Sequence, residues 1–159
     1  MDNIKVSIKG TLIGKFEKVV KELPFAEKRA LISAAYFLRD KIKQQLTSSL
    51  PKATVHNTKY NDTLADAVMF SKIDGASLTV HAMGTRRSGS GTYRTRFFEN
   101  DTKDRYQKTW NGQKLKKKRF LGHITGTHFF ATAVEANRSE TEQKIIDVLE
   151  KYVQQTING

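Results

Sequence analysis

The 159-residue sequence has no cysteine, only two prolines and one tryptophan, and fewer acidic than basic residues. Without cysteine there are no disulfide bonds and no thiolate metal sites, so packing or assembly with partners must hold the fold together. No window approaches the roughly 20 apolar residues that a membrane-spanning helix needs. Residues 1–10 also lack the basic-then-apolar order of a secretory signal. We therefore expect a protein made in a cytoplasm-like setting, with no membrane partner.

Recognised catalytic and metal-binding motifs are also lacking. The four histidines, at positions 56, 81, 123 and 128, form no known metal-ligand spacing, and the sequence contains no GxSxG, Walker A or GxGxxG motif. The stretch 84–92 has the glycines of a phosphate-binding loop but not their order. We expect no bound metal, no cofactor and no enzymatic activity.

What the sequence does have is a concentrated positive charge. The net charge is +12, from 28 Lys or Arg and 16 Asp or Glu. Twelve of the basic residues and only three acids, Glu99, Asp101 and Asp104, lie between Gly84 and His123, which gives this segment +9. Charge confined to one segment indicates a local task, because scattered charge would serve solubility equally well.

Apolar periodicity predicts the regular elements of the N-terminal half. Residues 4–10 alternate as a half-buried strand, and a short helix is expected at 12–23. Pro24 interrupts it and opens a second helix over 25–48, which Leu50-Pro51 ends. The apolar stripe of this second helix consists of Leu31, Ala34, Ala35, Leu38, Ile42 and Leu46.

The central part of the chain predicts antiparallel strands. Residues 52–63 are polar and predict a loop, and residues 64–73 lead into a strand. Asp74-Gly75 then predicts a tight hairpin, because both central positions of such a turn favour positive φ. The returning strand is 76–83. A further strand over 93–98 would place Arg94 and Arg96 on one face.

Two stretches without a stable period, 84–92 and 104–127, are predicted to be binding loops or segments that a partner orders. Helix follows at 129–137 and restarts where Ser139 and Glu142 form a capping-box pattern. The fold class is therefore α+β, in one domain spanning 1–159. An antiparallel β-sheet packs against a long N-terminal helix and a C-terminal helix, with two long basic loops.

Three interpretations of the basic run 114–120, KLKKKRF, remain open. It can be a solvated loop, a nuclear address in a eukaryotic host, or a nucleic-acid contact in which lysines neutralise phosphates and nearby aromatics stack on bases. No helix-turn-helix, RNP or zinc-finger pattern accompanies it, so contact with a nucleic-acid backbone or an acidic protein surface is favoured over base reading.

A metal-dependent nuclease or RNase-type toxin is a further alternative. It would use Glu99, Asp101 and Lys103, which lie together after a predicted strand. The sequence offers no matching acid on a neighbouring strand other than Asp74, which belongs to the predicted turn.

Three segments resemble the tail-completion or head–tail joining proteins of long-tailed double-stranded DNA phages. NDTLADAVMFS (61–71) is similar to a Thr-Gly-x-Leu segment of that family, and YRTRFFENDT (93–102) to its aromatic-x-x-aromatic-Glu-x-Gly-Thr strand end. GTHFFATAVEAN (126–137) resembles its His-Pro-Phe-x-x-Pro-Ala entry to the last helix. The similarity covers residues 25–155. Ala65 and Asp101 lie near family glycines, and Phe129 and Thr132 replace family prolines.

The resemblance implies a structural virion protein of the neck or tail, made in the bacterial host cytoplasm. It would form a ring of six copies between the head connector and the tail tube or its terminator, with DNA passing through the lumen. Repetition around such a ring would multiply the local positive charge, so the basic loops would line the channel or dock on a neighbouring ring. The residues assigned this role are Arg86, Arg87, Arg94, Arg96, Lys114, Lys116, Lys117, Lys118 and Arg119.

Overall fold

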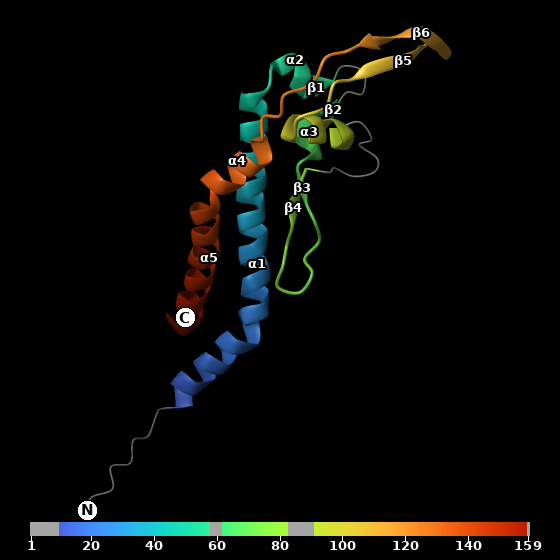
Figure 1. Cartoon of the computed structure of the whole chain (residues 1–159). Coiled ribbons are helices and arrows are strands. Elements are labelled where there is room, and N and C mark those ends of the chain that lie inside the picture. Colours follow the sequence, from blue (N-terminus) through green and yellow to red (C-terminus); the bar gives the residue numbers. More distant parts are fainter. Residues whose placement is uncertain (1–9, 58–61, 83–90, 159) are drawn as a thin grey trace, which may run out of the picture.

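The computed structural model describes residues 10–57, 62–82 and 91–158 (Figure 1). Helices and short antiparallel strands combine in an α+β fold, as predicted. In chain order the elements are α1 (Gly10–Ser49), α2 (Lys52–Val55), β1 (His56–Asn57), β2 (Asp62–Thr63), the 3-10 helix η1 (Leu64–Ala67), β3 (Met69–Phe70), β4 (Val80–His81), α3 (Gly91–Glu99), β5 (Tyr106–Trp110), β6 (Gln113–Phe120), α4 (Phe129–Ala136) and α5 (Arg138–Asn158).

The longest element, α1, runs without interruption through Pro24, so the prediction of two separate helices is wrong. Figure 1 shows α1 changing direction once in its N-terminal part, as expected when a proline ring displaces the preceding turn. α5 packs beside α1 before the proline as well as after it. Lys15 Nζ donates to the Ile157 carbonyl at 2.6 Å, and the Tyr152 hydroxyl donates to the Glu22 carboxylate. These tertiary contacts hold both parts in one helix.

Small residues let α5 approach α1 closely. Ala26, Ala30 and Ala34 recur every fourth residue on α1, and all three are buried.

The hydrogen bond to Glu22 raises the pKa of Tyr152 above its usual value. The phenol therefore stays protonated at neutral pH, and the contribution of its hydrogen bond to stability is lost as the pH rises through that raised pKa.

The hydrophobic core lies along the C-terminal half of α1, as the predicted apolar stripe required. Ile42 and Leu46 are fully buried there, and Leu38 is partly buried against them. The rest of the core comes from η1, α2 and α4. The buried side chains of the cluster are Ile42, Leu46, Val55, Leu64, Val68, Phe129 and Ala133.

Within residues 10–57, 62–82 and 91–158, the strands form three separate antiparallel pairs, β1–β2, β3–β4 and β5–β6. The predicted hairpin at Asp74-Gly75 is confirmed, with Phe70 opposite Val80 and Asp74 bridged to Ser77. Its central residues are Gly75 and Ala76, one position later than the sequence suggested, and Gly75 alone of the two has positive φ, +57°. The polar stretch 52–63, predicted to be a loop, contributes α2, β1 and β2.

Residues 93–98 belong to helix α3 and not to the predicted strand. Thr95, near its middle, is buried and donates from its hydroxyl to the Ala82 carbonyl at 2.8 Å. The strand alternation from which a shared face for Arg94 and Arg96 was predicted therefore does not apply to this segment. The predicted capping box is also wrong, because α5 begins at Arg138 and encloses Ser139. The predicted strand over 4–10 lies outside the described residues apart from Gly10, which begins α1.

Candidate functional site

The basic run forms one strand of a β-hairpin, which corrects the prediction of a loop over 104–127. β5 and β6 pair antiparallel, with Tyr106 opposite Phe120 and Trp110 opposite Gln113. The turn residues Asn111 and Gly112 have φ of +46° and +78°. Positive φ at both positions is the geometry of a type I′ turn, for which Asn-Gly is the preferred pair. This signal was present in the sequence, but sequence analysis missed it because the flanking lysines obscure the alternation.

The β5–β6 hairpin extends away from the helices (Figure 1). Its strands contact each other and very little else. Tyr106 is 50% exposed, and Trp110 and Phe120 are each 56% exposed. The rings of Tyr106 and Phe120 lie 5.4 Å apart at an angle of 51° and shield each other in part. An isolated two-stranded hairpin is only marginally stable in water. The β5–β6 hairpin therefore receives little stabilisation from packing against the rest of the described chain.

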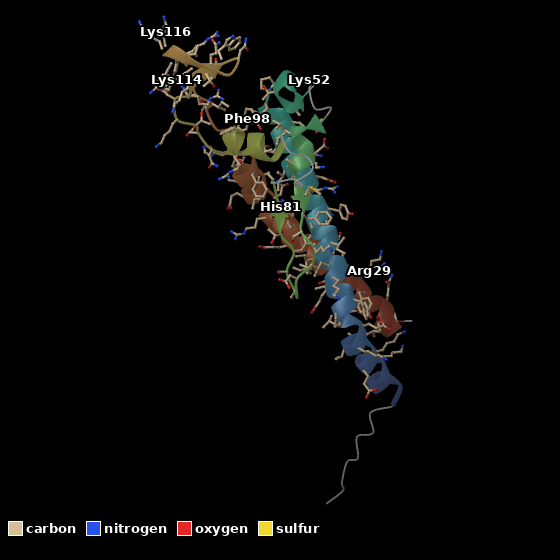
Figure 2. All side chains as sticks on the ribbon, turned by 90° about the vertical axis from the view of Figure 1, so that its right-hand side faces the viewer. Arg29, Lys52, His81, Phe98, Lys114 and Lys116 are labelled. Carbon is tan, nitrogen blue, oxygen red and sulfur yellow. The ribbon has the colours of Figure 1, made fainter. Side chains whose placement is uncertain are left out.

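Six cationic side chains and no acid lie between Tyr106 and Phe120. All six are exposed, and no ion pair among the described residues involves any of them. Figure 2 shows Lys114 and Lys116 at one end of the molecule, with their ammonium groups directed outward. We call these six the hairpin cations: Lys108, Lys114, Lys116, Lys117, Lys118 and Arg119.

The lysine run coincides with an irregularity in the strand pairing. Gln107 pairs with Arg119 and Thr109 pairs with Lys114, so Lys108 alone lies opposite Leu115–Lys118. A bulge of this kind leaves backbone groups of the longer strand without ladder partners and increases the local twist. Lys116, Lys117 and Lys118 therefore lie on the least constrained part of the hairpin.

Hydrogen bonds join the two chain segments where the β5–β6 hairpin meets the rest of the protein. We call this junction, residues 99–105 and 121–127, the root of the hairpin, and we call the helices with the core the body. Arg105 N–H donates to the Gly122 carbonyl at 3.0 Å, and Leu121 N–H donates to the Arg105 carbonyl at 2.8 Å. One step closer to the body, Thr102 N–H donates to the Ile124 carbonyl at 2.9 Å, and the Thr102 hydroxyl accepts from Ile124 N–H at 2.8 Å. The two chain segments thus leave the body as a hydrogen-bonded pair.

Glu99 and Gly126 complete this root. Both carboxylate oxygens of Glu99 accept backbone N–H groups in the first turn of α4, from Phe130 at 2.8 Å and from Ala131 at 3.1 Å. A carboxylate at this position satisfies free amides and complements the helix dipole. A Cβ on Gly126 would lie 2.8 Å from the Asn100 carbonyl carbon, so only glycine permits this close approach.

The acids of the nuclease alternative take part in this same root. Glu99 caps α4, and Asp101 Oδ1 accepts the Gly126 N–H at 2.8 Å. Lys103 is exposed. In the described part of the chain, no three His, Asp or Glu side chains lie close enough together to hold a metal ion. The geometry around these residues is therefore that of a structural joint.

The other predicted site residues are not on the hairpin. Arg86 and Arg87 lie outside the described residues. Arg94 falls in α3, but its side chain is outside the described part as well. Arg96 is exposed on α3, where it lines a cleft of about 240 Å³ beside Val80 and Phe129. The structure thus brings Lys114, Lys116, Lys117, Lys118 and Arg119 together and adds Lys108, which sequence analysis did not assign.

The three segments that resemble the phage proteins meet around one part of the core. α3 contacts both η1 and α4, and Thr127 N–H donates to the Phe98 carbonyl at 2.7 Å.

Comparison with protein-family models, with curated proteins and with solved structures gives no match. Among the described helices, none combines the length and apolar character needed to cross a membrane.

Proposed function

We propose that this chain is a non-enzymatic virion assembly protein of the head–tail joining type. In this proposal several copies, six by the resemblance, form a ring between the head connector and the tail tube or its terminator, and DNA passes through the lumen. The β5–β6 hairpin is the element that each copy uses to dock outside its own chain.

The observation that carries the proposal is a basic, aromatic hairpin that its own chain does not cover. Three aromatic side chains of the hairpin are about half exposed or more, and the six hairpin cations have no acidic neighbour on either strand. Exposed apolar groups rimmed by charge are typical of interaction surfaces. A hairpin that is marginal alone becomes stable when a partner buries it, which suits a part that functions in an assembly.

A rigid root supports the same role. Glu99, Thr102 and Gly126 fix the direction in which the hairpin leaves the body, so every copy in a ring would present it at the same angle. Symmetry then repeats one docking element around the ring. The contacts of α3 with η1 and with α4 bring the three resembling segments together beside the core, which is consistent with the family suggested by those segments.

The proposal is tested in a phage that carries this gene. Mass spectrometry of purified virions should detect the chain in the neck or tail. Changing Lys116, Lys117 and Lys118 to Gln should cause unjoined heads and tails to accumulate, because docking loses three charges while the fold is retained. A matched control changes Lys18, Lys21 and Lys28, three exposed lysines of α1, and should join particles normally. Absence of the chain from virions, or equal particle yields from both variants, would contradict the proposal.

A further inference from the structure

We infer that the ligand of the β5–β6 hairpin is duplex DNA, which the hairpin contacts through both phosphate rows of the major groove without reading its sequence. This inference rests on the proposed role of the hairpin as the docking element. It adds the chemical class of the partner.

The shape of the hairpin fits a groove. Two antiparallel strands form a ribbon, and the major groove of B-DNA, about 12 Å wide, admits a two-stranded ribbon. β5, the strand without the bulge, has five residues, and at about 3.3 Å per residue the paired ribbon extends for about 17 Å. The hairpin can reach this far because it stands clear of the helices (Figure 1).

The placement of the charges favours two rows of phosphates over a flat acidic surface. Consecutive residues of a regular strand point to opposite faces, so Lys108 on β5 lies on the other face from Gln107 and its cross-strand partner Arg119, and the ribbon carries charge on both sides. A groove has a phosphate backbone along each edge and can meet both sides. An acidic protein surface would meet one side and leave the other cations unneutralised.

The aromatic side chains favour a duplex over a single strand. Stacking of unpaired bases requires free ring faces on a platform. Tyr106 and Phe120 instead lie against each other, with centroids 5.4 Å apart. Trp110 remains, at the turn, where it would be positioned at the floor of the groove. Lysine and arginine contacts to phosphate then supply the affinity, and no base specificity follows.

The test is a salt titration of binding to a 30-base-pair duplex by fluorescence anisotropy. If each hairpin cation neutralises one phosphate, the logarithm of the binding constant should fall with the logarithm of salt concentration with a slope of about −5. Affinity should then drop about a thousandfold between 50 and 200 mM salt. The variant with Lys116, Lys117 and Lys118 changed to Gln should have a slope of about −2.7, and its affinity should drop about fortyfold over the same range of salt concentration.

The control with Lys18, Lys21 and Lys28 changed to Gln has the same net charge as the hairpin variant, so it separates position from total charge. It should keep the wild-type slope. Circular dichroism and thermal unfolding of both variants establish that they are folded. Equal slopes for the two variants, or no duplex binding by the wild type at 50 mM salt, would overturn the inference.

Two further binding measurements compare the duplex with other polyanions. Single-stranded DNA of the same length and poly-glutamate should both bind at least tenfold more weakly than the duplex. Tighter binding of the single strand would assign the hairpin to unpaired nucleic acid, and equal binding of poly-glutamate would assign it to acidic protein. Either result would overturn the duplex assignment while leaving virion incorporation, the test of the proposed function, unaffected.

Discussion

The β3–β4 hairpin lies along α1, whereas the β5–β6 hairpin leaves the body altogether (Figure 1). In β3–β4 the strands are only two residues long. The Phe70 ring meets the Tyr36 ring edge-on at 4.9 Å, and the Arg39 guanidinium lies 5.8 Å from its centre. In β5–β6 the strands have five and eight residues, but the rings of Tyr106 and Phe120 meet only within the hairpin.

This difference shows that neighbours, more than strand length, determine which hairpin belongs to the body. Val80 of β4 and Ala82, which directly follows this strand, pack against the core, so a very short ladder suffices. In the described part of the chain, no other helix or strand packs closely against the longer β5–β6 ladder, and the ladder carries charge on both faces. One hairpin therefore contributes to stability, and the other is available for binding.

The largest expected effect comes from the core that holds β4. Changing Phe129, which is fully buried, to Ala should lower the free energy of unfolding by about 3–5 kcal/mol, because it removes a ring and leaves a cavity. Urea unfolding measures the loss. Hydrogen exchange should accelerate at β3–β4 together with the helices and change little at β5–β6, because we expect this exposed hairpin to open locally without unfolding of the core. A loss under about 1 kcal/mol would show that Phe129 is not central to this packing.

The second-largest loss of stability is expected at the root of the β5–β6 hairpin. Changing Gly126 to Ala should cost about 1–3 kcal/mol, because the new Cβ is forced against backbone atoms that cannot move independently. Thermal unfolding measures the cost, and Gly14→Ala, at an open position of α1 without positive φ, provides a comparison outside the root. An unchanged melting temperature for Gly126→Ala would mean that the close approach of 99–101 to 126 is relaxed in solution.

A matched pair of phenylalanines compares the two hairpins directly. Changing Phe70 to Ala removes an aromatic pair and a cation–π contact and should cost about 1–2 kcal/mol. Changing Phe120, which is 56% exposed, to Ala should cost less than about 0.5 kcal/mol. Chemical denaturation of both variants under one condition measures the difference. Equal losses would show that β5–β6 is packed in solution as firmly as β3–β4.

A loss smaller than that of Phe70→Ala is expected at the helix cap. Changing Glu99 to Ala should cost about 1 kcal/mol, since two amides of α4 lose their acceptor. Changing it to Gln should cost less, because an amide oxygen still accepts a hydrogen bond. Thermal unfolding ranks the two variants. If Glu99→Gln instead abolished a metal-dependent nuclease activity of the purified protein at unchanged stability, the nuclease alternative would replace the structural role.

Sequence reasoning succeeded where a local pattern is not contradicted by distant contacts. The stripe that includes Ala34, Ile42 and Leu46 is buried as its period predicts, and Asp74-Gly75 does begin a turn. It failed at residues 93–98, where alternation suggested a strand. There, the burial of Thr95 and its hydrogen bond to the Ala82 carbonyl join a helix to the core. The residues next to Thr95 in the sequence do not reveal this contact, because Ala82 lies 13 positions away.

For the candidate site, the composition of the sequence located the positive charge but not the secondary structure that carries it. Five of the six hairpin cations were assigned from sequence, yet as part of a loop. Asn111-Gly112 was the available signal for a hairpin. The role of Glu99 had no local signal, since the amides that it caps are more than thirty residues away along the chain.

By itself, the sequence determined the α+β class, the long apolar stripe of α1 and the concentration of positive charge between Gly84 and His123, because each of these depends on residue type and spacing alone. Only the tertiary structure decided that α1 continues through Pro24, that Glu99 and Gly126 form a joint, and that the lysine run stands on a ribbon clear of the body. Those features depend on contacts between segments far apart in the chain, whose energies outweigh the local preferences of the residues that make them.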